Sequence, residues 1–265
     1  IDRDTYGQTV LVLQGGGALG AYQVGVYQAL MDAGIEIDWV IGTSIGAINA
    51  ALIAGSPPAE RIDRLTDFWH RIERYSYVPG IMPAWMSSAV RNMFAVTAGV
   101  PNFFKPQPAA LLGQHVPLGA ESASYYSVEP LMATLTDLVD FDLINNGPTR
   151  LTVGAANVGT GQMRYFDSRD MTIDVRHVMA SGALPPAFPA VRIDGELYWD
   201  GGIVSNTPVE AVFDDMPRRS AVIFAVHLWN AEGKEPETLW DVTNRQKDLQ
   251  YASRAVSHIF RQRQI

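Results

Sequence analysis

A serine flanked by glycines stands where a short strand is expected to give way to a helix. The stretch Gly42 to Gly46 reads Gly-Thr-Ser-Ile-Gly and matches G-x-S-x-G. In this pattern a tight strand-to-helix turn exposes the serine hydroxyl, and the glycines remove steric obstacles. The helix N-terminus then favours negative charge near that hydroxyl. The pattern predicts a nucleophilic Ser44, with a simple helix N-cap as the alternative.

A second glycine-rich turn follows the first expected strand and opens the first expected helix. Gly15, Gly16 and Gly17 present backbone N–H groups that no side chain obstructs, so they could cradle an anion. In an acyl hydrolase such amides hold the oxyanion of the tetrahedral intermediate. The same turn, through Gly20, also satisfies G-x-G-x-x-G, which keeps a dinucleotide-binding module open as an alternative. The acidic residue that binds ribose in such modules is missing after the second strand.

A carboxylate ends a later strand in a similar turn. Asp200 is followed by Gly201 and Gly202, and it comes directly after the apolar stretch 197–199. Strand ends of this kind line active sites in parallel α/β folds. A lone Asp-Gly pair is more often a surface turn, so the interest of this carboxylate depends on partnership with Ser44.

A serine nucleophile needs a proton acceptor, and the usual acceptor is histidine. The chain has five histidines, and none has a setting that marks it as a base. His177 is the best placed but falls inside an expected helix, where a packing or hydrogen-bonded role is more common. His227, at the end of an expected strand, is a lesser candidate.

The elements that must position these turns alternate between strand and helix. Apolar runs at 9–14 and 39–41 each lead through a glycine turn into a segment with helical spacing, at 20–33 and 45–54. Further helices are expected at 59–74, 129–139 and 174–180, and further strands at 151–158, 162–167, 197–199 and 221–228. This alternation predicts an α/β fold in which helices cover a mainly parallel central sheet.

The length and composition favour one domain. The chain has 265 residues, of which 47% are hydrophobic and 18% charged, enough for a substantial core. We therefore expect a single domain over 1–265. Within it, residues 75–126 lose helical and strand periodicity and are rich in Pro, Met and aromatic residues, which suggests an insertion or cap. A polar helical tail is expected from about residue 236.

Charge and cysteine content exclude several functions. Twenty basic against 28 acidic residues give a formal net charge of -8, whereas a nucleic-acid partner would need a basic face. No apolar stretch reaches the roughly 18 residues needed to span a bilayer, so any membrane contact is expected to be peripheral. The chain has no Cys, which excludes thiolate metal sites and fits a reducing compartment. We expect a cytoplasmic protein that can associate with a membrane surface.

The three glycine-rich turns, Gln14 to Gly20, Gly42 to Gly46 and Asp200 to Gly202, occur in an order and context that resembles the patatin-like phospholipase family. The stretch 180–189, Ala-Ser-Gly-Ala-Leu-Pro-Pro-Ala-Phe-Pro, also looks like the family's segment before its catalytic Asp. The resemblance covers nearly the whole chain. It implies a three-layer α/β/α sandwich with a Ser-Asp dyad and no His.

The resemblance also implies a chemistry. Ser44 would attack the acyl carbonyl of a phospholipid or lysophospholipid, and Asp200 would take the hydroxyl proton, return it to the leaving alcohol and then activate water. No metal or organic cofactor is expected. Many members carry Arg or Lys at the position of Leu19, so the glycine loop here lacks a cation that could attract phosphate. An acyltransferase with the same serine turn is the alternative activity.

Overall fold

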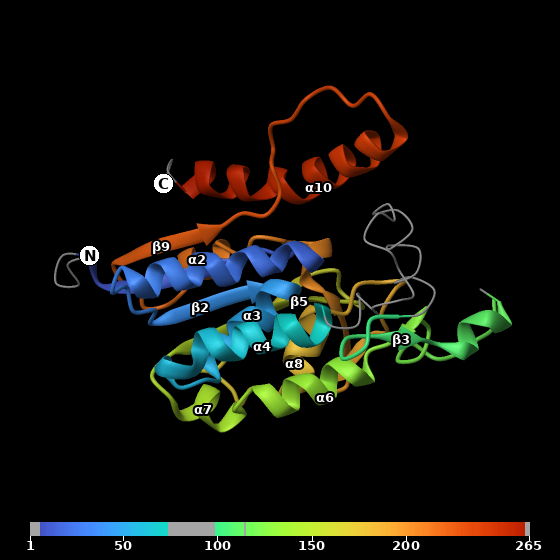
Figure 1. Ribbon diagram of the computed structural model, residues 1–265, viewed down its shortest axis with the longest axis horizontal. Helices are drawn as coiled ribbons and strands as arrows, with labels where there is room; N and C mark the ends of the chain where they lie inside the picture. The colour runs from blue at the N-terminus through green and yellow to red at the C-terminus, as the bar shows by residue number, and fades with distance from the viewer. Residues whose placement is uncertain (1–5, 74–98, 114, 263–265) are drawn as a thin grey trace.

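The computed structural model describes residues 6–73, 99–113 and 115–262, with residues 253–262 described as backbone only (Figure 1). Its centre is a seven-stranded sheet. The strands are β1 (Gln8–Leu13), β2 (Trp39–Thr43), β5 (Arg150–Asn157), β6 (Met163–Asp167), β7 (Val191–Ile193), β8 (Glu196–Asp200) and β9 (Ala221–Val226). They are ordered β7-β8-β5-β2-β1-β9, and β6 also pairs with β5.

The sheet is parallel through its middle and antiparallel at one side. β9, β1, β2 and β5 run parallel to one another, whereas β6 and β8 pair antiparallel with β5, and β7 with β8. The predicted α/β class with a mainly parallel central sheet is confirmed. A separate small sheet joins β3 (Lys105–Pro106) and β4 (Tyr126–Ser127).

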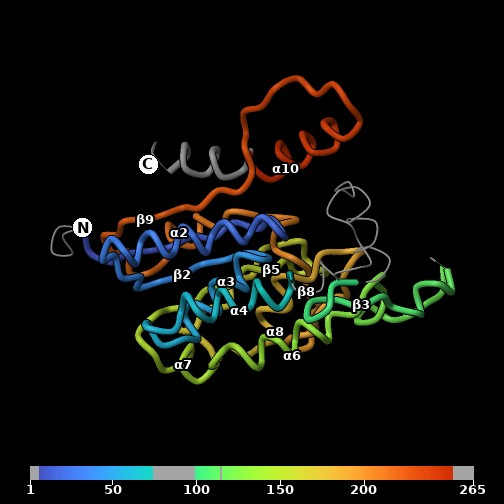
Figure 2. Tube along the Cα trace, viewed as in Figure 1, coloured from blue at the N-terminus to red at the C-terminus, as the bar shows by residue number. Residues whose placement is uncertain are grey.

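Helices cover the sheet unequally. The helices of the described residues are α2 (Ala21–Asp32), α3 (Ile45–Ala54), α4 (Arg61–Glu73), α6 (Glu129–Leu138), α7 (Phe141–Asn146), α8 (Val175–Ser181), α9 (Glu210–Phe213) and α10 (Leu239–Gln262). Short 3-10 turns lie at η1 (Gly17–Gly20), η2 (Pro58–Glu60), η3 (Pro108–Leu112) and η4 (Gly201–Ile203). Figures 1 and 2 show α6 and α7 on one side of the strands and α10 on the opposite side.

Alternate side chains of β1 enter two separate cores, as the period of a strand requires. Leu11 and Leu13 belong to the large core. The same core contains α3, and every residue of α3 is buried. Val10 and Val12 belong to a small core that α9 and β9 complete. The expected three-layer sandwich therefore has one thick helical layer and one thin one.

All the strands and helices expected from the sequence occur, with ends that differ by a few residues. Outside the expected insertion, the sequence patterns missed three short elements, α7, β7 and α9, which are too short to show a period. Of the expected insertion, residues 75–98 lie outside the described part of the chain. Residues 99–126 hold η3 and the small β3-β4 sheet. The single-domain organisation stays a prediction.

The register of the sheet brings two distant turns together. β6 occupies one edge of β5, so β2 and β8 must share the other edge. β2 pairs with β5 as far as Thr43, which lies opposite Gly154. β8 pairs with β5 from the next position onward, and its last residue, Asp200, lies opposite Ala155. Because β2 and β8 run in opposite directions, their C-terminal ends meet. Ser44, the residue after β2, therefore lies beside the end of β8.

The turn after β2 also requires a close approach of α3 to β1. A Cβ on Gly46 would lie 2.2 Å from the carbonyl oxygen of Leu13, which is backbone and cannot move aside. Gly46→Ala should therefore lower the free energy of unfolding by about 2 kcal/mol or more, as overpacking does. Urea unfolding followed by circular dichroism measures this.

Gly25→Ala is the matched control for this substitution. Gly25 is an exposed glycine inside α2, and a Cβ there would meet nothing within 4 Å. It should raise the free energy of unfolding by about 0.5–1 kcal/mol, because Ala favours helix over Gly. Equal effects of the two substitutions would contradict the close approach.

Candidate active site

Ser44 occupies a strained turn between β2 and α3. Its backbone has φ 57° and ψ -127°, a left-handed conformation that is costly for a residue with a side chain. It stands at the N-cap of α3, yet its side chain makes no capping hydrogen bond. The simple-cap alternative therefore loses its support. The preceding Gly42 allows the turn, since a Cβ there would lie 2.3 Å from the carbonyl of Gly46.

The end of α8 holds this turn in place. The amide of Ser44 donates to both the carbonyl and the hydroxyl oxygen of Ser181, at 3.1 and 3.0 Å. The Ser181 hydroxyl in turn donates to the carbonyl oxygen of Gly154 in β5, at 2.6 Å. Sequence reasoning gave Ser181 no role of its own. Its only signal was its place in the segment that resembles the family's.

Asp200 is a buried carboxylate at the end of β8, with 2% of its surface exposed. Its Oδ1 accepts a hydrogen bond of 2.7 Å from the amide of Gly202. Burial raises the pKa of Asp200 to about 6, and hydrogen bonds from the Ser44 side chain and the Gly202 amide partly oppose this rise. The two residues singled out in distant turns are thus neighbours that line the same space.

The close packing of η4 explains its two glycines. A Cβ on Gly201 would lie 2.5 Å from the carbonyl oxygen of Gly154, and one on Gly202 would lie 2.8 Å from Asn206 Oδ1. Gly20 is crowded in the same way by Ile45, at 2.5 Å. These predicted motif positions are therefore glycine for lack of room.

The glycine loop, Gly15 to Gly17, lines the same cavity as the Asp200 carboxylate. Its backbone amides differ in whether they already donate to an acceptor in the protein. Gly15 donates its N–H to the carbonyl oxygen of Asn206 at 3.1 Å, and its own carbonyl accepts from Asn206 Nδ2 and Trp229 Nε1, at 2.9 and 2.8 Å. Among the described residues, the amides of Gly16 and Gly17 have no acceptor. An oxyanion would therefore depend on these two amides, with Gly15 fixing their position.

Gln14, the residue before the loop, ties it to the end of the chain. This fully buried side chain donates to Thr207 Oγ1 at 2.7 Å and to the carbonyl oxygen of Tyr251 in α10 at 3.2 Å. It also accepts from the amide of Trp229, at 3.1 Å. Neither Gln14 nor these partners could be identified as site residues from the sequence, because only the tertiary structure brings them together.

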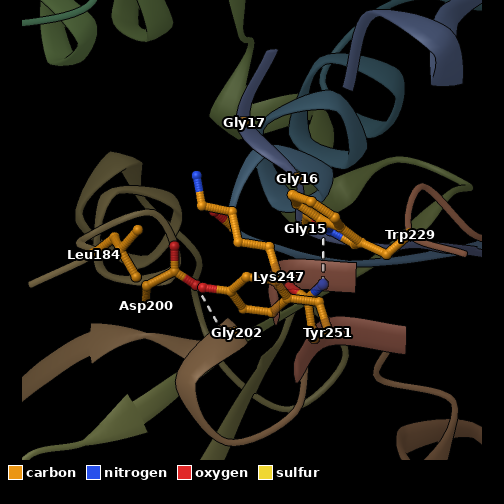
Figure 3. A pocket seen from close by; sticks show the side chains of 11 residues that line it. Gly15, Gly16, Gly17, Leu184, Asp200, Gly202, Trp229, Lys247 and Tyr251 are labelled. Carbon is orange, nitrogen blue, oxygen red and sulfur yellow. Dashed lines mark hydrogen bonds between the residues drawn. The ribbon is translucent and has the colours of Figure 1, made fainter. Parts of the chain in front are cut away.

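Two cavities open on either side of Ser44 and Asp200. The first, of about 210 Å³, lies between the glycine loop and α10 and is lined by Trp229, Lys247 and Tyr251. Figure 3 shows these side chains around Asp200 and the loop. The second, of about 280 Å³, is apolar, and its lining includes Ile45, Ile48, Trp69, Ile72, Phe103 and Phe188. The dyad candidates therefore stand at a junction between a partly polar and an apolar space.

Neither cavity is lined by a histidine among the described residues. His177 instead completes a capping box with Asp174 at the start of α8, and its ring packs edge-on against Phe166. Burial lowers the pKa of His177, which keeps the ring neutral near pH 7. The structure thus gives His177 a packing role and leaves Asp200 as the carboxylate beside Ser44.

The charge on Asp200 should cost the protein stability at neutral pH. The folded-state pKa of about 6 lies above the ordinary 3.8, so the unfolded chain releases the proton first as the pH rises. Stability is lost between about pH 4 and pH 6. Asp200→Asn removes the charge and keeps an acceptor for Gly202.

We compare the free energy of unfolding of Asp200→Asn with that of the wild type at each pH. The difference should favour Asp200→Asn by about 2 kcal/mol more at pH 8 than at pH 4. Urea unfolding of both proteins at the two pH values measures the difference. A gain that does not depend on pH would show that the carboxylate is not buried as described.

Comparisons with known proteins agree with this arrangement. The sequence model of the patatin-like phospholipase family matches residues 11–213. A patatin-like phospholipase domain-containing protein of Caenorhabditis elegans is 29% identical over 203 residues, which cover 76% of this chain and 12% of that protein. A lysophospholipase of Aspergillus niger is 28% identical over 245 residues, covering 89% of this chain and 13% of that protein.

One further comparison is with a solved structure. VipD from Legionella pneumophila aligns with a TM-score of 0.44 and 18% identity, covering 82% of this chain and 49% of that chain. Of the two curated relatives named in the preceding paragraph, the chain spans about an eighth of the length. The family match takes in the end of β1, η1, the Ser44 turn, Asp200 and η4. On this match, the chain belongs to the patatin-like phospholipase family.

Proposed function

We propose that this chain hydrolyses fatty acyl esters of phospholipids or lysophospholipids through an acyl-enzyme intermediate, with Ser44 as nucleophile and Asp200 as base. The observation that carries the proposal is the placement of Ser44 beside the buried Asp200 carboxylate, at the junction of the two cavities that both residues line. The name of the fungal relative, lysophospholipase, supports the substrate class.

The first half-reaction forms the acyl-enzyme. The Ser44 oxygen bonds to the acyl carbonyl carbon while its proton passes to Asp200, and the carbonyl oxygen becomes an oxyanion beside the free amides of Gly16 and Gly17. The intermediate then collapses. The ester C–O bond breaks, and the leaving alcohol takes the proton from Asp200.

The second half-reaction regenerates the serine. Asp200 takes a proton from a water molecule, whose oxygen attacks the acyl carbon, and the collapse of this intermediate returns the proton to Ser44 and releases the fatty acid. Burial makes this step easier, because it raises the pKa of Asp200 to about 6 and so makes the carboxylate a stronger base than an exposed one.

The apolar cavity suits the acyl chain. Its lining comes mainly from α3, α4 and the segments around Phe103 and Phe188, and Ser44 is part of it. A fatty acyl group bound there removes apolar surface from water and puts its carbonyl carbon at the serine. The partly polar cavity on the other side then remains for the leaving alcohol.

Removing either member of the dyad should abolish most of the activity. Ser44→Ala and Asp200→Asn should each lower kcat/KM for lysophospholipid hydrolysis by at least about 10³, because they act in the same proton transfer. Release of free fatty acid by the purified protein measures the rate. His177→Ala and His227→Ala are the controls and should stay within about tenfold of the wild type. A loss of the size seen for Ser44→Ala in either control would replace the dyad with a triad.

Shortening the apolar cavity should change chain-length preference. Ile72 lines this cavity from α4, and Ile72→Trp would fill part of it. The ratio of kcat/KM for dodecanoyl over acetyl p-nitrophenyl esters should fall about tenfold or more, since the longer chain loses its place. Met132→Trp, at an exposed position outside both cavities, should leave the ratio unchanged. An unaltered ratio in Ile72→Trp would place the acyl chain elsewhere.

A further inference from the structure

A lysine from the last helix reaches the candidate active site. Lys247 of α10 lines the partly polar cavity together with the glycine loop, Ser44 and Asp200. In Figure 3 its side chain extends across the cavity, and its amine nitrogen appears between Gly17 and Asp200. A residue more than 200 positions from Ser44 in sequence thus brings a positive charge to the side of the dyad opposite the apolar cavity.

The position of Lys247 follows from how α10 is anchored. The carbonyl of Tyr251 accepts a hydrogen bond from buried Gln14, and the Tyr251 ring packs against Trp229 at a centroid distance of 5.1 Å. The charge of Asp200 helps burial to raise the pKa of Tyr251, so this face of α10 lies near the dyad. Lys247 is four residues before Tyr251, one helical turn away on the same face.

The charge of Lys247 has no partner among the residues that the structure describes. In the described part of the chain it makes no salt bridge or hydrogen bond, whereas Arg245, on the same helix, donates to the carbonyls of Asn230 and Ala231. A lysine with no structural partner is available to a ligand. Its ammonium has three donors and no acceptor, so it suits an anionic group.

The glycine loop leaves room for such a role. The stretch 14–20 contains no Lys or Arg, and its position 19 is an exposed leucine. With a net charge of -8, the protein as a whole repels an anionic substrate, so a local cation is needed to hold one. Lys247 provides it on the leaving-alcohol side, where a lysophospholipid carries its phosphate close to the ester.

We infer that Lys247 is a specificity-determining residue that binds the phosphate of the leaving alcohol. The inference rests on the proposed function, because it assumes that the acyl chain occupies the apolar cavity and the alcohol the other. It assigns to α10, which lies beyond the part of the chain that the family model matches, a direct part in choosing the substrate.

The test compares two substrates that differ only in the phosphate. Kinetics of the purified chain are measured on a lysophosphatidic acid and on a monoacylglycerol with the same acyl chain, both in neutral detergent micelles. Lys247→Met should lower the ratio of kcat/KM, phosphate substrate over neutral substrate, by about tenfold, the effect expected for losing one charge-assisted hydrogen bond. The loss should appear mainly in KM.

Three further variants separate charge from structure. Lys247→Arg should keep most of the ratio, because it keeps the charge, and Lys247→Glu should lower it further than Lys247→Met. Lys234→Met removes the same charge from an exposed position outside the cavity and should leave the ratio unchanged. Added salt should reduce the wild-type ratio and have little effect on that of Lys247→Met.

The outcomes distinguish the two levels of the proposal. If both substrates are hydrolysed and the ratio of kcat/KM is the same in the wild type and in the variants at position 247, the inference is overturned and the proposed function stands. No fatty acid release from either substrate overturns both. In a last measurement, inorganic phosphate is added to the monoacylglycerol reaction at the concentration of the lipid. If it inhibits the wild type but not Lys247→Met, free phosphate is the ligand of Lys247, and the assignment of Lys247 to the phosphate of the substrate is overturned.

Discussion

The meeting of two strand ends on one edge of β5 is the constraint on which the candidate site depends. β2 runs along this edge until Thr43, and antiparallel β8 takes over at Ala155, so the residues that follow both strands share one space. The lack of room at Gly201, whose Cβ would lie 3.0 Å from Thr43 Cγ2, shows how closely the ends approach. A shift of β8 by one residue would turn Asp200 to the other face of the sheet.

This arrangement has an energetic cost that the proposed chemistry would use. Burial of Asp200 disfavours its ionised form and destabilises the fold near neutral pH. The left-handed backbone of Ser44 adds strain. Both are held by the surrounding hydrogen bonds, in which Ser181 fixes the amide of Ser44 and Gly202 fixes the carboxylate. The same burial raises the pKa of the carboxylate, which supports the proposed role of Asp200 as a base.

The site is completed by segments that the motifs do not include. Gln14 joins the glycine loop to Trp229 and α10, which closes one side of the candidate site. α3, α4 and the region near Phe103 form the apolar side. The part of the described chain outside the three glycine turns thus decides which groups can reach Ser44. Within the described residues, no helix is both long enough and apolar enough to cross a bilayer.

The sequence by itself determined the local turns and the class of fold. The turns can be recognised in the sequence because they need glycine at positions 42, 46 and 201, where backbone contacts leave no room for a side chain. The strands and helices can be recognised because their hydrophobic periods reflect burial over a few consecutive residues. Only the tertiary structure decided that Asp200 meets Ser44, that Gly15 has its amide occupied, and that Lys247 lies over the cavity. Such contacts depend on strand register and helix packing between distant residues, which no local pattern of residues encodes.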